Sequence, residues 1–107
     1  MNILVTGSAG MIGGYVVKGL IEKGHKVLGV DRLKPSLESI DESLELREDF
    51  VVDLSGKEAI GKVFEEHRID RCIHLAALAH TKGVADTSWE AFKKVNVDCA
   101  VNLFEAC

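Results

Sequence analysis

The sequence predicts an α/β fold in which helices flank a parallel β-sheet. Two observations lead to this prediction. Short apolar segments alternate with segments of helical periodicity along the 107 residues, which is typical of strands joined by crossover helices. The apolar segments are also nearly continuous, without the polar–apolar alternation of strands that face water, and this indicates a sheet covered on both faces.

The first third of the chain predicts a strand, a helix and a second strand. Residues 2–6 form a short apolar run, and residues 11–23 are apolar over the wide arc of a buried helix, with Gly24 as its stop. Residues 25–30 form a second apolar run that Asp31 closes. A strand, a helix and a strand within about 30 residues make a βαβ unit.

The middle of the chain predicts a long loop, a third strand and a second helix. Residues 33–49 contain a proline, three serines and six acidic residues, so we interpret them as a mostly irregular, solvated acidic connection. Residues 50–52 predict the third strand. Ser55 and Glu58 have the spacing of a capping box, which predicts a helix over residues 56–67.

The last third predicts a fourth strand over residues 71–76, a loop over residues 77–86 and a final helix. Thr87 and Glu90 form a second capping box, and the helix continues to Cys107. Its apolar stripe runs to the last residue, and the sheet ends on an apolar strand, so we expect the N-terminal part of a longer protein. The stripe consists of Phe92, Val95, Cys99, Leu103 and Cys107.

Composition narrows the class of protein. Hydrophobic residues make up 47% and charged residues 28% of the chain, as in ordinary folded domains. The net charge is −4 with no basic stripe, so we expect no nucleic-acid partner. No apolar run approaches the roughly 20 residues of a membrane span, and no secretory signal is visible. Three cysteines without a C-x-x-C pair favour free thiols in a reducing cytoplasm.

A glycine-rich segment lies between the first predicted strand and the first predicted helix. Residues 7–13 read GSAGMIG. In a dinucleotide-binding loop Gly7 permits the tight turn, Gly10 lets the backbone approach a pyrophosphate, and Gly13 allows close helix packing. The spacing is G-x-x-G-x-x-G and not the commoner G-x-G-x-x-G, and a glycine triplet alone also fits a simple turn. Its position between strand and helix favours the phosphate-binding interpretation.

Asp31 supplies a second element of such a site. It follows the second strand, 18 residues beyond Gly13. A carboxylate there can accept both hydroxyls of an adenosine ribose and repels a 2′-phosphate, which favours NAD over NADP. Arg32 leaves NADP as the weaker alternative, because an arginine can pair with that phosphate. Together these features predict a partial Rossmann fold with strand order 3-2-1-4 and NAD over the carboxyl ends of the strands.

Five motifs in register cover the whole chain. They are TGSAGMIG at 6–13, VDR at 30–32, VDL at 52–54, HLAA at 74–77 and VNV at 95–97. With these motifs the sequence resembles the extended short-chain dehydrogenase/reductases, and within them the NAD-dependent epimerase/dehydratase family that acts on nucleotide sugars.

The resemblance implies a role for each matching residue. Asp31 and Arg32 would meet the adenosine ribose. Asp53 would accept the exocyclic amine of adenine, and the backbone N–H of Leu54 would meet its ring. The residues that it assigns to the pyrophosphate turn and to the nicotinamide ribose are Gly7, Gly10, Met11, Ile12, Leu75, Ala76 and Ala77.

The family's helix asparagine falls on Asn96. This residue lies on the apolar side of the predicted last helix, between Phe92 and Ala100. A buried amide needs hydrogen-bond partners. Two interpretations remain open, namely a structural bond to a neighbouring loop, or a brace for the strand ends that bind the cofactor.

The chain departs from the family in its catalytic residues. That chemistry needs a Ser or Thr and a Tyr-x-x-x-Lys pair, with the tyrosine as general base. The only tyrosine here is Tyr15, and Gly19 stands four residues later. We therefore expect residues 1–107 to be an N-terminal NAD-binding portion, without the catalytic and substrate-binding C-terminal part and with little or no turnover.

Three functional hypotheses follow. The first is the NAD-binding portion of a nucleotide-sugar epimerase or dehydratase, whose longer parent binds a nucleotide sugar. The resemblance implies a homodimer formed through helices that include the last one, and exposed apolar surface in a truncated chain is the alternative cause of assembly. The second is a non-catalytic dinucleotide-binding or sensing module, and the third is a ketone or aldehyde reductase of the same extended family. A metal site at His74, His80 and Asp86 is conceivable, but histidines at a strand end are more often structural.

Overall fold

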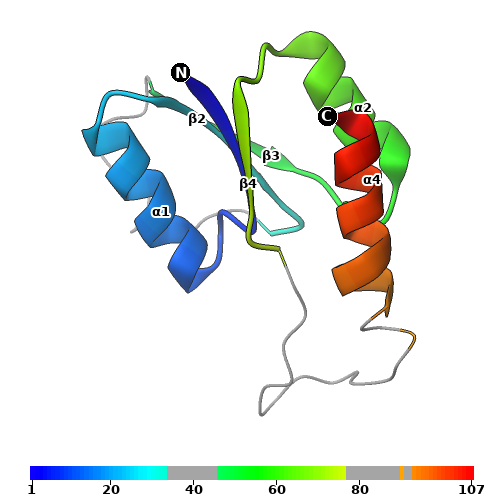
Figure 1. Ribbon diagram of the computed structural model, residues 1–107. Coiled ribbons are helices and arrows are strands. Elements are labelled where there is room, and N and C mark those ends of the chain that lie inside the picture. The colour runs from blue at the N-terminus through cyan, green and yellow to red at the C-terminus, as the bar shows by residue number, and fades with distance from the viewer. Residues whose placement is uncertain (34–45, 77–89, 91–92) are drawn as a thin grey trace.

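The computed structural model describes residues 1–33, 46–76, 90 and 93–107. Its sheet contains four strands, all paired in parallel, in the order β3-β2-β1-β4 (Figure 1). This confirms the α/β class and the predicted strand order. The strands are β1 (Asn2–Thr6), β2 (Lys26–Asp31), β3 (Arg47–Val51) and β4 (Arg71–His74).

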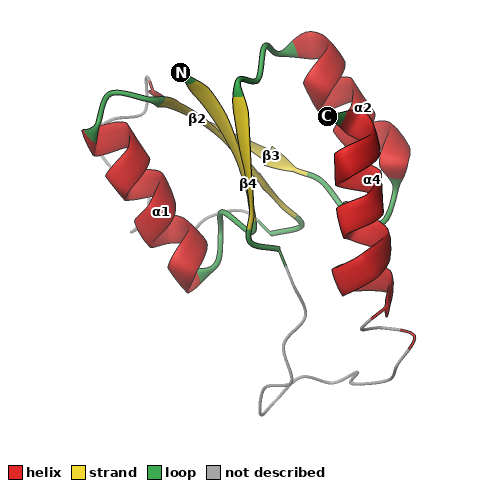
Figure 2. Cartoon of the chain, in the orientation of Figure 1, coloured by secondary structure: helices red, strands yellow, loops and turns green. Residues whose placement is uncertain are grey.

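Helices cover both faces of the sheet. One face packs against α1, and the other against α2 and α4 (Figure 2). A π-helical turn, η3, leads directly into α4. The helical elements are α1 (Met11–Glu22), α2 (Lys57–Glu66), η3 (Lys93–Asp98) and α4 (Cys99–Ala106).

The middle of strand β1 is apolar, because it consists of Ile3, Leu4 and Val5. Ile3 and Val5 pack in the cluster beneath α1, whereas Leu4 packs in the cluster beneath α2 and α4. Side chains alternate between the two faces of a strand, so consecutive apolar residues in a central strand supply both clusters. Helix α1 ends as predicted, because Gly24 adopts φ of +86° and donates to the carbonyl of Ile21 over 2.9 Å.

The third strand begins earlier than the sequence predicts. Its register pairs Val27 with Arg47 and Asp31 with Val51, so three polar residues assigned to the acidic loop belong to the sheet. Backbone pairing with β2 does not require apolar side chains at this edge. The guanidinium of Arg47 is buried and holds Asp49 through Nε–Oδ2 and Nη2–Oδ1 hydrogen bonds of 2.7 and 3.2 Å.

The predicted capping box of the second helix is wrong. The N-cap is Gly56, and no side chain caps α2. The backbone N–H of Ser55 donates to Oδ1 of Asp53 over 2.9 Å. Asp53 thus forms a local side-chain turn immediately before α2, in place of the cap that the sequence predicts from Ser55.

The final helix is confirmed in part. Thr87 and Phe92 lie outside the described residues. Within the described part, Cys99 and Leu103 are buried as the stripe predicts, whereas Cys107 is exposed. The amide of Asn102 donates to the carbonyl of Leu54 over 2.8 Å and ties α4 to the turn that precedes α2.

The cysteines are free thiols, as the sequence predicts. Burial, with a smaller contribution from the thiol of Cys107, raises the pKa of Cys72 to about 11, so this thiol stays protonated at neutral pH. In the described parts of the chain, no helix is long and apolar enough to cross a membrane.

We predict that Leu103→Ala destabilises the fold by about 2–5 kcal/mol, because it opens a cavity between α4 and the sheet. Leu103 is fully buried and packs in the same cluster as Leu4 and Ile60. The matched variant is Val101→Ala on the exposed side of α4, where we expect a change of about 0.5 kcal/mol or less. Urea unfolding measures both, and equal losses would contradict this packing.

Candidate functional site

The strands end around a hollow of about 280 Å³, which we call the carboxyl-edge hollow. Segments that follow β1, β2, β3 and β4 all contribute to its wall. In open α/β sheets this edge is where ligands bind. The lining residues are Gly7, Ala9, Gly10, Val30, Asp31, Arg32, Leu33, Val52, Asp53, Leu54, Leu75, Ala76 and Cys99.

The glycine loop is shaped by two close backbone approaches. Gly7 adopts φ of +70°, donates to the carbonyl of Val30 over 2.8 Å, and leaves 2.9 Å between a hypothetical Cβ and the nitrogen of Ala76. A Cβ at Gly13 would overlap the carbonyl oxygen of Gly7. Only glycine fits at both positions, so the loop stays tight between β1, β4 and α1.

Helix α1 points its N-terminus at this loop. Its N-cap is Gly10, which has no side chain to accept from the first-turn N–H groups, and the first turn contains no acidic residue. The positive end of the helix and its N–H groups therefore remain suited to an anion. The glycine segment noted in the sequence thus forms a tight turn that ends at an uncapped helix N-terminus.

Asp31 connects β2 to the glycine loop. Its Oδ2 accepts from the N–H of Ala9 over 2.9 Å, and its Oδ1 accepts from the N–H of Leu33 over 3.1 Å. Each carboxylate oxygen keeps a further lone pair, so these bonds leave Asp31 able to accept ligand hydroxyls. The bracing of the loop by Asp31 was not predicted from the sequence.

The far wall of the hollow carries a second carboxylate. Asp53 is exposed after β3, where its Oδ1 accepts from Ser55, and the following Leu54 is buried in the core. Two carboxylates therefore line the same hollow as the glycine loop at the N-terminus of α1. This arrangement suits a ligand with hydroxyl and amine donors at one end and an anionic group beside the glycines.

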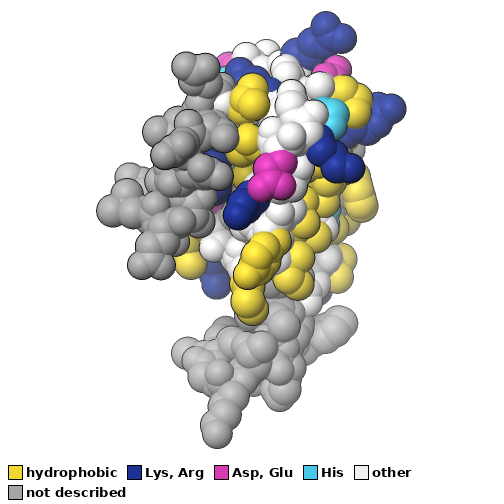
Figure 3. All heavy atoms as spheres, turned by 90° about the vertical axis from the view of Figure 1, so that its left-hand side faces the viewer, with side chains coloured by type: hydrophobic (Ala, Val, Ile, Leu, Met, Phe, Trp, Pro, Cys, Tyr) yellow, Lys and Arg dark blue, Asp and Glu magenta, His cyan; other side chains and the backbone are white. Residues whose placement is uncertain are grey.

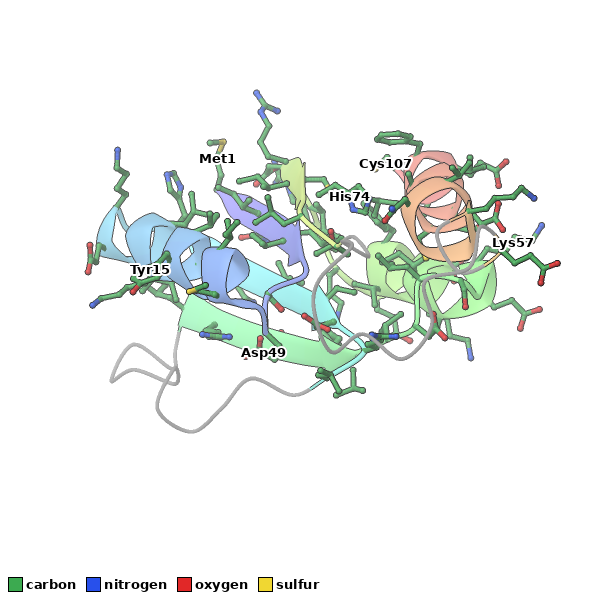
Figure 4. All side chains as sticks on the ribbon, turned by 90° about the horizontal axis from the view of Figure 1, so that it is seen from below. Met1, Tyr15, Asp49, Lys57, His74 and Cys107 are labelled. Atoms are coloured by element: carbon green, nitrogen blue, oxygen red, sulfur yellow. The ribbon has the colours of Figure 1, made fainter. Side chains whose placement is uncertain are left out.

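Thr6 links the end of β1 to the end of β4. Its buried hydroxyl lies 2.6 Å from Nδ1 of His74 and accepts from the N–H groups of Leu75 and Ala76 over 3.0 and 3.1 Å. Burial lowers the pKa of the His74 ring. His74 lies on the side of the sheet that faces α4 (Figure 4).

Most of the predicted site residues come together in the hollow. Met11 and Ile12 do not line it. They are 80% and 67% exposed in the first turn of α1, where apolar side chains gather at the surface in Figure 3. Ala77 lies outside the described residues. The predicted residues that line the hollow are Gly7, Gly10, Asp31, Arg32, Asp53, Leu54, Leu75 and Ala76.

The expectation of a buried Asn96 is wrong, because its side chain is exposed. The prediction applied α-helical spacing, but Asn96 lies in the π-helical turn η3. The i→i+5 bonds of such a turn rotate the following residues relative to an α-helix. Farther along, in α4, the amide of Asn102 donates to the carbonyl of Leu54.

Sequence reasoning missed several lining residues. Val30 and Val52 precede the two predicted aspartates, so their place in the VDR and VDL motifs could have indicated them. Cys99 was assigned only to the apolar stripe. The missed residues are Ala9, Val30, Leu33, Val52 and Cys99.

A metal centre finds no support in the described residues, which contain no cluster of three or more metal-ligating side chains. His80 and Asp86, which the conceivable site required, lie outside those residues.

Comparison with known proteins agrees with this geometry. The model of the NAD dependent epimerase/dehydratase family matches residues 3–107. The chain belongs to this family. It is similar to UDP-glucose 4-epimerase of Caenorhabditis elegans, with 33% identity over 100% of this chain and 34% of that protein. It is also similar to UDP-glucuronate 4-epimerase of Thermodesulfobacterium geofontis, with 32% identity over 95% of this chain and 34% of that protein.

Solved structures of similar proteins share the fold. The UDP-glucose 4-epimerase of Thermus thermophilus, in complex with NAD, has a TM-score of 0.82 and 36% identity over 100% of this chain and 33% of that chain. Pal from Bacillus thuringiensis has a TM-score of 0.87 and 33% identity over 100% of this chain and 35% of that chain. The chain spans about a third of the length of the curated relatives it matches.

We predict that Gly13→Ala destabilises the chain by about 1–3 kcal/mol, because the added methyl group meets the carbonyl of Gly7. The neighbouring Gly14→Ala is the matched control. It lies in the same helix with nothing within 4 Å of the added methyl group, so we expect up to about 1 kcal/mol of stabilisation. Thermal unfolding of both variants checks the difference, and a stabilised Gly13→Ala would contradict the close approach.

Proposed function

We propose that residues 1–107 form the NAD-binding portion of a nucleotide-sugar epimerase or dehydratase, with the dinucleotide held across the carboxyl-edge hollow by the G-x-x-G-x-x-G loop. The observation that carries this proposal is the hollow itself, which combines the glycine loop, two carboxylates and the end of β4. The NAD complex of the related Thermus thermophilus epimerase supports the choice of cofactor.

The glycine loop fits a pyrophosphate because a side chain at Gly13 would overlap the Gly7 carbonyl and prevent this tight turn. In this role the first-turn N–H groups of α1 donate to phosphate oxygens, and the positive helix end offsets their charge. Met11 and Ile12 lie in the same turn and present exposed side chains next to Gly10. We assign them to the pyrophosphate turn.

The adenosine half fits the two carboxylates. Each carboxylate oxygen of Asp31 accepts one backbone N–H, from Ala9 or Leu33, and has a second lone pair that accepts a hydrogen bond from a ribose hydroxyl. Asp53 accepts the exocyclic amine of adenine, and the backbone N–H of Leu54 meets the ring. Arg32 borders the same end of the hollow, but the Asp31 carboxylate disfavours a 2′-phosphate there, so we propose NAD over NADP.

The nicotinamide half is assigned to the end of β4. Leu75 and Ala76 line the hollow there, and Ala77 continues the same motif. The protein contributes binding and orientation, while bound NAD supplies the capacity to accept and return a hydride. Asn96 is exposed in η3, and we retain both roles proposed for it, a structural bond to a neighbouring loop or a brace for the strand ends that bind the cofactor.

The 107 residues contain no Tyr-x-x-x-Lys pair, so we expect NAD binding without turnover from this chain alone. A non-catalytic dinucleotide-binding module is the second candidate, because the hollow and the glycine loop would serve binding without catalysis. Relatives named for UDP-glucose, UDP-glucuronate and dTDP-glucose support a nucleotide sugar as the substrate of a full-length protein.

We predict that calorimetric titration gives saturable binding of NAD and weaker binding of NADP. Asp31→Asn removes a charged acceptor of the ribose hydroxyls, so NAD affinity should fall about tenfold or more. It also removes the charge that repels a 2′-phosphate, so the ratio of NAD to NADP affinity should decrease. The matched control is Glu66→Gln, which removes one exposed charge at the end of α2, away from the hollow. Binding of neither dinucleotide by the folded chain would reject the proposal.

A further inference from the structure

The hydroxyl of Thr6 has a fully determined set of bonds. A hydroxyl carries one proton and accepts through two lone pairs. Leu75 and Ala76 both donate N–H groups to this oxygen, with the Leu75 N–H shared with the Thr6 carbonyl at 3.3 Å. The lone pairs are therefore occupied, and the hydroxyl proton is directed to Nδ1 of His74, 2.6 Å away.

This bonding fixes the state of the His74 ring. A ring nitrogen that accepts a hydrogen bond carries no proton of its own, so Nδ1 is unprotonated and the single ring proton of the neutral imidazole is on Nε2. A charged ring has N–H groups at both nitrogens and could not accept from Thr6. The neutral ring is therefore a condition for the bonds that Thr6 receives from Leu75 and Ala76.

We propose that His74 is a positioning residue for the dinucleotide, and that its protonation in acid loosens the end of β4 and weakens NAD binding. The proposal rests on the proposed function. His74 does not line the hollow, whereas Leu75 and Ala76 do, so it acts through the Thr6 hydroxyl.

The same junction reaches the glycine loop. Gly7 follows Thr6 directly, and a hypothetical Cβ at Gly7 would lie 2.9 Å from the nitrogen of Ala76. A shift of Ala76 therefore presses on the turn that shapes the phosphate end of the hollow. The hydrogen bonds of Thr6 therefore couple Leu75 and Ala76, which we assign to the nicotinamide half, to the glycine loop.

The direction of the pH effect follows from burial. Desolvation lowers the pKa of His74 below its ordinary value of 6.5, and it is the sole cause of the shift. The bond is therefore complete above about pH 6.5 and is lost as pH falls below 6.5 towards the folded pKa. The described charged or titratable side chains of β4, η3 and α4 with its C-cap on this side of the sheet are Cys72, Lys93, Asp98, Cys99, Glu105 and Cys107.

The test compares NAD affinity by calorimetry at pH 8 and at an acidic pH at which NMR shows the His74 ring of the folded chain to be protonated. The native chain should lose about three- to tenfold in affinity, the value of one hydrogen bond. His74→Asn places an amide oxygen near the position of Nδ1 and cannot titrate, so its affinity should be the same at both pH values. His25→Asn is the matched control, because His25 lies at the opposite edge of the sheet, beside the N-terminal amine. This variant should lose as much NAD affinity in acid as the native chain.

Variants of Thr6 separate positioning from packing. Thr6→Val keeps the shape and removes the hydroxyl, so affinity should fall about tenfold at pH 8 with no further loss in acid. Thr6→Ser restores the hydroxyl and should recover both the affinity and the pH dependence. Urea unfolding of each variant confirms that the compared chains are folded.

NMR of the imidazole nitrogens of the native chain gives a readout that is independent of ligand. We expect the Nε2–H tautomer of His74 at neutral pH, and an Nδ1–H tautomer would overturn the proposal. An acid loss in His74→Asn equal to that of the native chain would overturn the proposal and leave NAD binding intact. A native chain that binds no NAD at pH 8 would reject the proposed function and this role together.

Discussion

The close approach of three backbone segments around Gly7 is the constraint on which the rest of the structure depends. The turn after β1 must contact the end of β4 on one side and the first turn of α1 on the other. Glycine at positions 7 and 13 removes the side chains that would separate these segments. The positive end of α1 and the walls of the carboxyl-edge hollow take their relative positions from this contact.

Polar groups around that contact serve structure and site together. Asp31 uses its carboxylate to hold the loop, and the same carboxylate borders the hollow. Thr6 joins two strand ends, and it couples them to a titratable ring. A site built in this way gains rigidity because its binding groups are fixed by their own hydrogen bonds before any ligand arrives.

The sequence was sufficient where a residue's role depends on its neighbours in the chain. The apolar run of β1, the glycine loop and Asp31 were predicted because strand periodicity and turn geometry are local. The sequence was insufficient where backbone pairing or helix geometry elsewhere in the fold determines the position of a residue. Arg47 joins the sheet through pairing with β2, and Asn96 is exposed because a π-helical turn changes the helical phase. The bond from Thr6 to His74 joins residues 68 positions apart, so no local pattern could indicate it.

An NMR titration of the ¹⁵N-labelled chain with NAD tests the central claim most directly. If the dinucleotide lies across the carboxyl-edge hollow, the amide signals that shift belong to the glycine loop, Asp31, Leu54 and Ala76. Signals at the opposite edge of the sheet, such as those of Lys26 and Arg71, should stay in place. Shifts centred on the outer surfaces of α2 and α4, with the glycine loop unchanged, would contradict the account.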